Sequence, residues 1–270
     1  MSDQAGGRYR PPDFTGTTAV VTGGGQGIGA AIARALAGCG ARVVISGRHE
    51  STLKAVAGEI AESGGACGWV AGSVTDPEHV TELMVTAAGA DGVIHALVNN
   101  AGIAGPTTPL ADLSLADWNE TIAVNLTGVF LACREAIPYL RAALRGKIVN
   151  IGSASGKRPL PNRTPYTAAK LGVVGLTRSL AHELGPDNIS VNTISPFGVD
   201  NPRLDRVISE MAQVSGRSPA EVREGLTSAT AFGRGVTEDD VARLTLMLCS
   251  SVADDMTGQD INMTAGLVMY

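Results

Sequence analysis

Short apolar runs alternate with helical stretches along the 270 residues, and this alternation limits the possible folds more than any other feature. A parallel sheet needs such crossovers between its strands, and helices then cover both of its faces. We expect one α/β domain with a doubly wound sheet of about seven strands and a ligand crevice at their carboxyl ends. The expected strands are 17–23, 41–46, 67–72, 93–100, 147–152, 189–195 and 259–265, and the expected helices are 28–40, 51–65, 76–89, 114–144, 165–184, 203–228 and 238–249.

No linker or internal repeat divides the chain, so the domain is expected to cover residues 14–270. Residues 1–13 are predicted to be a flexible lead-in, because Gly6, Gly7, Pro11 and Pro12 resist regular structure. The polar segment 197–230 combines loop length with helical composition, which is typical of a mobile lid over a substrate.

Charge and cysteine usage restrict the partners and the compartment. Twenty-one basic and 26 acidic residues give a net charge of −5, which provides no reason to expect nucleic acid or an anionic membrane as a partner. The apolar runs are too short to span a bilayer, and the N-terminus lacks an apolar signal core. The cysteines are widely spaced and form no CxxC pair, which favours a cytoplasmic protein, here with a small-molecule partner. We expect no metal site, because neither the cysteines nor the histidines have ligand spacing: Cys39, Cys67, Cys133, Cys249, His49, His79, His95 and His182.

Glycine supplies 34 of the 270 residues, and its densest cluster joins the first expected strand to the first expected helix. The cluster reads Gly23-Gly24-Gly25-Gln26-Gly27-Ile28-Gly29. Glycines let the backbone turn sharply and approach a pyrophosphate, while the helix N-terminus supplies free N–H groups and a positive dipole. The cluster therefore predicts a dinucleotide site.

The GxxxGxG spacing of this turn resembles that of the classical short-chain dehydrogenases/reductases. The resemblance extends from residue 15 to residue 266 through several further motifs in the family's order: Asn99-Asn100-Ala101-Gly102, Asn125, Ser153, Tyr166 with Lys170, and Pro196. It implies a Rossmann fold and an NAD(P)(H)-dependent oxidoreductase that interconverts a ketone and a secondary alcohol.

Tyr166 and Lys170 stand four residues apart in an expected helix and therefore share one face. A phenol ordinarily has a pKa of about 10, and a nearby ammonium lowers it toward neutrality, where a general acid/base works best. The resemblance adds that Ser153 hydrogen-bonds the substrate oxygen, that Lys170 also holds the nicotinamide ribose, and that Asn125 positions a water that relays protons.

The end of the second strand bears on the choice of nicotinamide. No acid occurs there before Glu50, and Arg48 can pair with a 2′-phosphate, which favours NADP(H) over the alternative, NAD(H). A solvated loop arginine is the other interpretation of Arg48. The expected cofactor contacts are Gly23, Gly25, Gln26, Gly27, Ile28, Gly29, Arg48, Ser73, Val74, Asn100, Ala101, Gly102, Tyr166, Lys170, Pro196 and Val199.

The chain departs from the family pattern at several positions. Ser73 stands in place of an aspartate near the adenine, Phe197 in place of a glycine and Asn201 in place of a threonine. His95 also replaces an aspartate, and we interpret it as a different hydrogen-bond partner within the sheet. Arg163 is either a surface arginine or a ligand for an anionic or acyl-carrier group.

The substrate stays open between a 3-oxoacyl or polyketide-type ketone and a sugar or polyol. A non-catalytic partner subunit with the same fold is disfavoured because Asn125, Ser153, Tyr166 and Lys170 are all present. An epimerase or dehydratase of the family's extended branch is disfavoured by the length of the chain and the spacing of the turn. From the resemblance we also expect a homotetramer or homodimer, formed through 114–144, 165–184 and the last strand.

Overall fold

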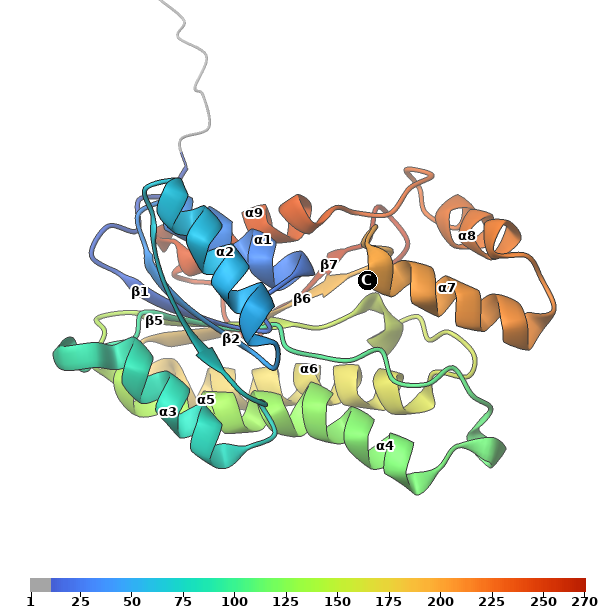
Figure 1. Ribbon diagram of the computed structural model, residues 1–270, viewed down its shortest axis with the longest axis horizontal. Helices are drawn as coiled ribbons and strands as arrows, with labels where there is room; N and C mark the ends of the chain where they lie inside the picture. The colour runs from blue at the N-terminus through green and yellow to red at the C-terminus, as the bar shows by residue number, and fades with distance from the viewer. Residues whose placement is uncertain (1–10) are drawn as a thin grey trace, which may run out of the picture.

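The computed structural model describes residues 11–270, so most of the expected lead-in, residues 1–10, lies outside the described part. Seven parallel strands form one sheet in the order β3-β2-β1-β4-β5-β6-β7. The doubly wound sheet that the alternation predicts is confirmed (Figure 1). The strands are β1 Thr18–Thr22, β2 Arg42–Gly47, β3 Ala66–Ala71, β4 Ala96–Asn99, β5 Gly146–Ile151, β6 Ile189–Pro196 and β7 Asp260–Met263.

Two helical layers enclose the sheet. One layer holds α1 Gly27–Gly38, α2 Glu50–Glu62 and α9 Glu238–Cys249, and the other holds α3 Pro77–Ala88, α4 Leu115–Ile122, α5 Gly128–Arg141 and α6 Thr164–Leu184 (Figure 1). Each layer packs an apolar cluster against its own face, so central strands such as β1 and β6 are buried along their whole length. Burial on both faces explains why these strands are continuous apolar runs in the sequence.

The expected helix 114–144 is helical from Leu115 to Arg141, but its winding changes in the middle. A π-helical turn, Ala123–Thr127, separates α4 from α5, and Asn125 lies in its middle. Turns of this kind are uncommon and often accompany functional sites. The side chain of Asn125 is tied to a neighbouring loop, as described below, so the change in helical winding coincides with a tertiary contact.

The expected helix 203–228 is also wrong in detail, because it consists of α7 Pro202–Ser215 and α8 Pro219–Ser228. Gly216 ends α7 in the left-handed conformation, with a φ of 69°, and Ser218 then caps α8 together with Glu221. The two helices share a small apolar cluster that includes Ile208, Ala212 and Val222. They lie at the right-hand end of the molecule in Figure 1, beside the carboxyl ends of the strands.

Within residues 11–270, no helix combines the length and apolar character needed to cross a membrane. The same residues contain no group of three or more His, Cys, Asp or Glu side chains that could hold a metal ion.

Candidate active site

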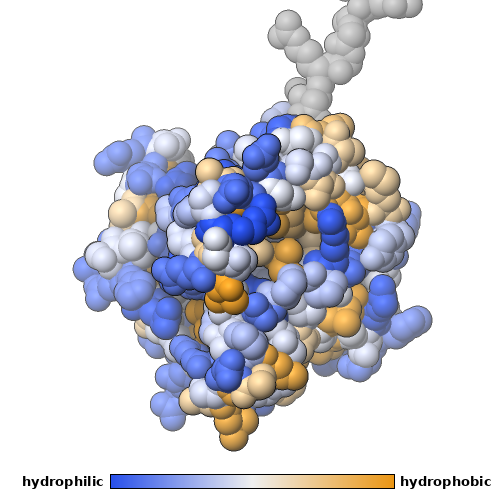
Figure 2. Space-filling model, turned by 90° about the vertical axis from the view of Figure 1, so that its right-hand side faces the viewer, coloured by the Kyte–Doolittle hydropathy of each residue, from blue (hydrophilic) through white to orange (hydrophobic). Residues whose placement is uncertain are grey.

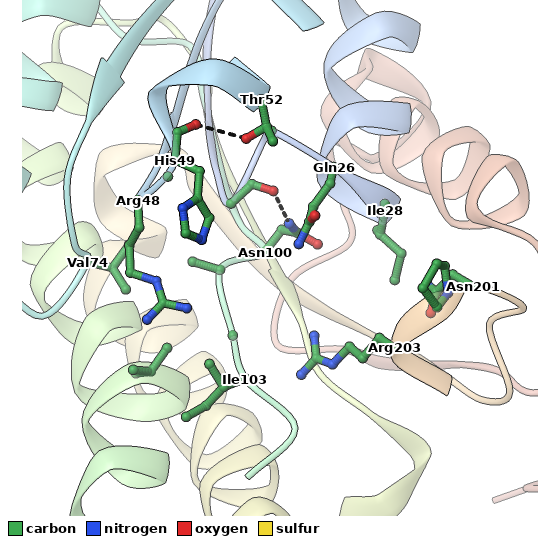
Figure 3. A pocket seen from close by; sticks show the side chains of 18 of the residues that line it. Gln26, Ile28, Arg48, His49, Thr52, Val74, Asn100, Ile103, Asn201 and Arg203 are labelled. Atoms are coloured by element: carbon green, nitrogen blue, oxygen red, sulfur yellow. Dashed lines mark hydrogen bonds between the residues drawn. The ribbon is translucent and has the colours of Figure 1, made fainter. Parts of the chain in front are cut away.

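A cavity of about 540 Å³ lies at the carboxyl ends of the strands, where the topology predicts the ligand crevice. Its walls come from the turn after β1, the ends of β2, β3 and β4, and the first turn of α7 (Figure 3). Thr22 pairs with Ser46 on one side and with Asn99 on the other, and this register brings the three strand ends level. Figure 2 views the molecule from this end and shows a hollow that both apolar and hydrophilic residues border.

The turn after β1 is held against the loop after β4. Asn100 donates from Nδ2 to the carbonyl oxygens of Thr22 and Gly23, at 3.1 and 3.0 Å. Thr22 Oγ1 accepts from the backbone N–H groups of Asn100 and Ala101, at 3.1 Å each. A Cβ at Gly29 would lie 2.2 Å from the Gly23 oxygen, so only glycine permits this approach.

The N-terminus of α1 opens toward the cavity and suits a dinucleotide's pyrophosphate. Within the described part of the chain, Gln26 makes no side-chain cap, and the first turn of α1 contains no acidic residue. The first N–H groups of the helix and its dipole are therefore available to an anion. At Gly25 a Cβ would lie 2.6 Å from Thr52 Oγ1, so the glycine is also needed for the turn to pack against α2.

The expected adenosine contacts line one end of this cavity. Arg48, Ser73 and Val74 all border it, and Arg48 extends along its wall in Figure 3. Ser73 hydrogen-bonds to Thr75 at 2.8 Å, which occupies its hydroxyl within its own loop. Several lining residues were missed in the sequence because no motif marks them: His49, Thr52, Ile103, Val124, Asp200, Arg203 and Glu238.

A smaller chamber of about 140 Å³ adjoins the cavity and contains Ser153, Tyr166 and Lys170. Ile28, Asn100, Asn201 and Arg203 line both spaces, so the two are continuous. The expected contacts Pro196 and Val199 line the chamber, and so does Phe197.

Tyr166 and Lys170 lie close together in the first part of α6, as their spacing indicates. Lys170 Nζ lies 5.8 Å from the centre of the Tyr166 ring, and it donates to the Ile151 carbonyl oxygen at 2.7 Å. Ser153 faces the same phenol from the loop after β5, and its Oγ also accepts from the N–H of Ser155 at 3.1 Å.

Charge around the phenol outweighs the effect of its burial. Burial alone would raise the pKa of Tyr166, but the cations of Lys170 and Arg203, a hydrogen bond from Ser153 and the cation of Arg163 together bring that pKa below 10.0. Burial lowers the pKa of Lys170, and the neighbouring Tyr166 partly opposes this effect. The arrangement favours a phenol that exchanges its proton more readily than a free tyrosine does.

Asn125 is fully buried, and its amide is engaged with the loop after β4. Its Nδ2 donates to the carbonyl oxygens of Thr121 and Ile103, at 2.9 and 3.1 Å, and its Oδ1 accepts from the Ile103 N–H at 3.2 Å. A Cβ at Gly102 would lie 2.6 Å from Asn125 Oδ1. The side chain therefore supports the wall of the cofactor cavity, while its expected part in a water relay stays a prediction.

Two departures from the family pattern have structural explanations. His95 Nδ1 accepts from the Thr18 N–H at 3.1 Å, so its interpretation as a hydrogen-bond partner in the sheet is confirmed. Asn201 caps α7 through the Leu204 N–H at 3.2 Å, and its Nδ2 donates to Glu238 at 3.0 Å.

The interpretation of Arg163 as a surface residue is wrong. This arginine, just before α6, is only 4% exposed, and its Cζ lies 4.9 Å from the centre of the Tyr166 ring. Arg203 reaches the same ring from α7, with its Cζ at 5.9 Å, and points into the cavity in Figure 3. Burial, countered in part by Tyr166, lowers the pKa of Arg163.

The chain is similar to known proteins over most of its length. A family model described as enoyl-(acyl carrier protein) reductase matches residues 23–268. The granaticin polyketide synthase putative ketoacyl reductase 1 of Streptomyces violaceoruber is 36% identical over 256 residues, which cover 93% of each chain.

Two further relatives extend the comparison. The cis-4-hydroxycyclohexanecarboxylate dehydrogenase of Sinomonas cyclohexanicum is 38% identical over 253 residues, covering 94% of this chain and 97% of the relative. A crystal structure of an actinorhodin polyketide ketoreductase variant with NADPH superimposes with a TM-score of 0.89 at 32% identity, covering 94% of this chain and 98% of that one. The chain therefore belongs to the short-chain dehydrogenase/reductase family of NAD(P)-dependent oxidoreductases.

Proposed function

We propose that this enzyme interconverts a ketone and a secondary alcohol with NADP(H), and that Tyr166 is its general acid/base. The observation that carries the proposal is the chamber in which Tyr166, Ser153 and Lys170 meet, directly beside the dinucleotide cavity. All four residues of the family's catalytic set are present, which disfavours a non-catalytic subunit.

When bound, the reduced nicotinamide supplies a hydride for the carbonyl carbon of the substrate. Ser153 donates a hydrogen bond to the carbonyl oxygen, and Tyr166 transfers its proton to that oxygen as negative charge develops. Lys170 keeps the resulting phenolate stable through its charge and holds the nicotinamide ribose. In the direction of alcohol oxidation, the Tyr166 phenolate takes the proton back.

Arg48 supports the preference for NADP(H). Arg48 lines one end of the cavity, and Arg203 from α7 lies at the other end in Figure 3. The solved ketoreductase that superimposes with a TM-score of 0.89 contains NADPH. A guanidinium that pairs with the 2′-phosphate contributes roughly 1.5–3 kcal/mol, which is about a tenfold or larger effect on affinity.

Replacement of Arg48 by serine tests this assignment. We expect the KM for NADPH to rise about tenfold or more and the KM for NADH to change little, while the exposed Arg178→Ser control on α6 leaves both unchanged. Equal effects on the two cofactors would refute the pairing with a 2′-phosphate.

A third cavity, of about 510 Å³, supports a 3-oxoacyl or polyketide-type ketone as the substrate. It meets the catalytic chamber at Leu160, Phe197 and Leu226, and its wall is largely apolar, with Met211, Val214 and Val222 among its residues. A sugar or polyol would place several of its hydroxyl groups against the apolar part of this wall, where they would lack hydrogen-bond partners. A panel of 3-oxoacyl substrates, steroids and polyols, followed by NADPH absorbance, tests the choice, and faster turnover of polyols would overturn it.

The expected lid and assembly belong to the same proposal. Residues 197–230 include α7 and α8, whose separate apolar cluster supports their movement as a lid. Large apolar side chains are exposed on the helices expected to form the interface between copies: Phe130 on α5 is 44% exposed and Leu171 on α6 is 51% exposed. Their exposure supports a homotetramer or homodimer in which a second copy covers them. Sizing by light scattering tests this assembly, and a monomer would refute it. Four free cysteines support residence in the cytoplasm.

A further inference from the structure

Arg163 is a buried charge that lacks a buried counter-charge. Among residues 11–270 no carboxylate forms an ion pair with it, and its one side-chain hydrogen bond goes from Nη1 to Thr107 Oγ1 at 3.3 Å. A guanidinium has five N–H donors, so most of its capacity is left for another partner. Buried charges in proteins are normally paired, which makes an arginine in this state a candidate ligand site.

The surroundings hold Arg163 in a fixed orientation. Thr107, which follows β4, accepts from Arg163 and donates to Glu210 Oε2 on α7 at 2.9 Å. Glu210 thus anchors the arginine through Thr107 without pairing with it directly. On its other side the guanidinium lies against the Tyr166 ring, with Cζ 4.9 Å from the ring centre. The arginine is therefore placed beside the group that acts on the substrate oxygen.

The chamber as a whole favours negative charge. Arg163, Lys170 and Arg203 surround Tyr166, and none of the described residues that line the chamber is Asp or Glu. Arg203 also lines the dinucleotide cavity, and its buried Nη2 lacks a hydrogen-bond partner among the described residues, so the cofactor's phosphates can satisfy it. Arg163 does not border that cavity, so its partner must come from the substrate side.

We propose that Arg163 binds a carboxylate of the substrate, and that the substrate is a 3-oxo acid, or the matching 3-hydroxy acid, in its free form. A carboxylate fits the fork of a guanidinium through two parallel hydrogen bonds and is compact enough for a chamber of about 140 Å³. In a 3-oxo acid a single carbon separates the carboxylate from the reacting carbonyl. The acid then binds Arg163 while its ketone oxygen meets Ser153 and Tyr166, and the alkyl chain extends into the apolar cavity beyond Phe197. This inference rests on the proposed ketone reduction and specifies its substrate.

The test compares 3-oxo acids of four to ten carbons with their methyl esters, using NADPH and four proteins: wild type, Arg163→Met, Arg163→Lys and the Arg178→Met control. We expect the wild type to prefer the acid by about tenfold to 100-fold in kcat/KM. In Arg163→Met the KM for the acid should rise at least 30-fold, whereas the KM for the ester should stay within about threefold. Any loss of kcat through the charge that Arg163 adds near Tyr166 should be the same for acid and ester. Arg163→Lys should recover part of the preference, and the control should keep all of it.

A structural role for Arg163 would raise the KM for the acid and the KM for the ester alike, and that result overturns the proposal. So does a wild-type enzyme that reduces the ester as well as the acid. If neither the acid nor the ester is reduced, binding is measured instead, as the rise in melting temperature that the 3-hydroxy acids cause in the presence of NADP⁺. A shift that Arg163→Met abolishes keeps the carboxylate site and rejects the ketone reduction, whereas no shift in the wild type rejects the carboxylate site as well.

Discussion

The contact between Gly29 and the turn after β1 leads to a quantitative prediction for Gly29→Ala. The new Cβ would lie 2.2 Å from the Gly23 oxygen and 2.4 Å from Asn100 Nδ2, and ordinary contact begins near 3.4 Å, so α1 must move by about 1.2 Å. The same Cβ also pushes Asn100 Nδ2 aside, which breaks the two hydrogen bonds of Asn100 to the turn. Two lost hydrogen bonds at about 1 kcal/mol each and about 1–3 kcal/mol of overpacking give about 3–5 kcal/mol of destabilisation.

Urea unfolding and NADPH titration by fluorescence measure the two consequences. We expect the free energy of unfolding to fall by that amount and the affinity for NADPH to fall at least tenfold, because the same movement displaces the N–H groups of the phosphate site. Gly38→Ala is the matched control, since Gly38 lies in the same helix and a Cβ there has open space. It should stabilise the protein by about 0.5–1 kcal/mol and leave the affinity unchanged. Wild-type stability and affinity in Gly29→Ala would refute the close packing of the turn.

Two further predictions concern buried polar groups. Asn150 accepts a hydrogen bond from Asn99 and donates one to Thr177, both at 2.8 Å. Asn150→Ala should therefore lower the free energy of unfolding by about 2–4 kcal/mol. A urea midpoint equal to that of the wild type would contradict this prediction. Burial lowers the pKa of His79 below 6.5, so the unfolded chain binds a proton before the folded protein does, and stability should decline as the pH falls below about 6.5. His79→Asn should reduce the difference between urea midpoints at pH 5.5 and pH 7.5, and an unchanged difference would show that other groups cause it.

The sheet and the phosphate turn could be predicted from the sequence because local patterns determine them. Strands buried on both faces are continuous apolar runs, and a sharp turn before a helix needs glycines in a fixed spacing. The contact between the ends of β1 and β4 follows from the pairing of these two parallel strands. Thr22 pairs with Asn99, and the next residues, Gly23 and Asn100, therefore lie side by side.

The π-helical turn at Asn125 could not be predicted, because Ala123–Thr127 contains neither glycine nor proline. It coincides with the contact of Asn125 with Ile103, 22 residues earlier in the chain. Tertiary contacts of this kind leave no local signal.

The burial of Arg163 is a similar case. The sequence around it, Pro161-Asn162-Arg163-Thr164, is typical of an exposed loop. Only the packing of α7 across this loop, through Glu210 and Thr107, turns the arginine into a buried neighbour of Tyr166. Arg203 gave no sequence signal either, because its role depends on how α7 lies over the strand ends.

The central claim is that Tyr166 transfers the proton, and Tyr166→Phe tests it most directly. The measurement is kcat for NADPH-dependent reduction of a ketone that the wild type turns over, together with the Kd for NADPH. We predict a loss in kcat of about 100-fold or more, which is typical of a missing general acid, with a Kd within about threefold of the wild type. The exposed Tyr270→Phe control should keep full activity. A Tyr166→Phe enzyme with unchanged kcat would contradict the proposed mechanism.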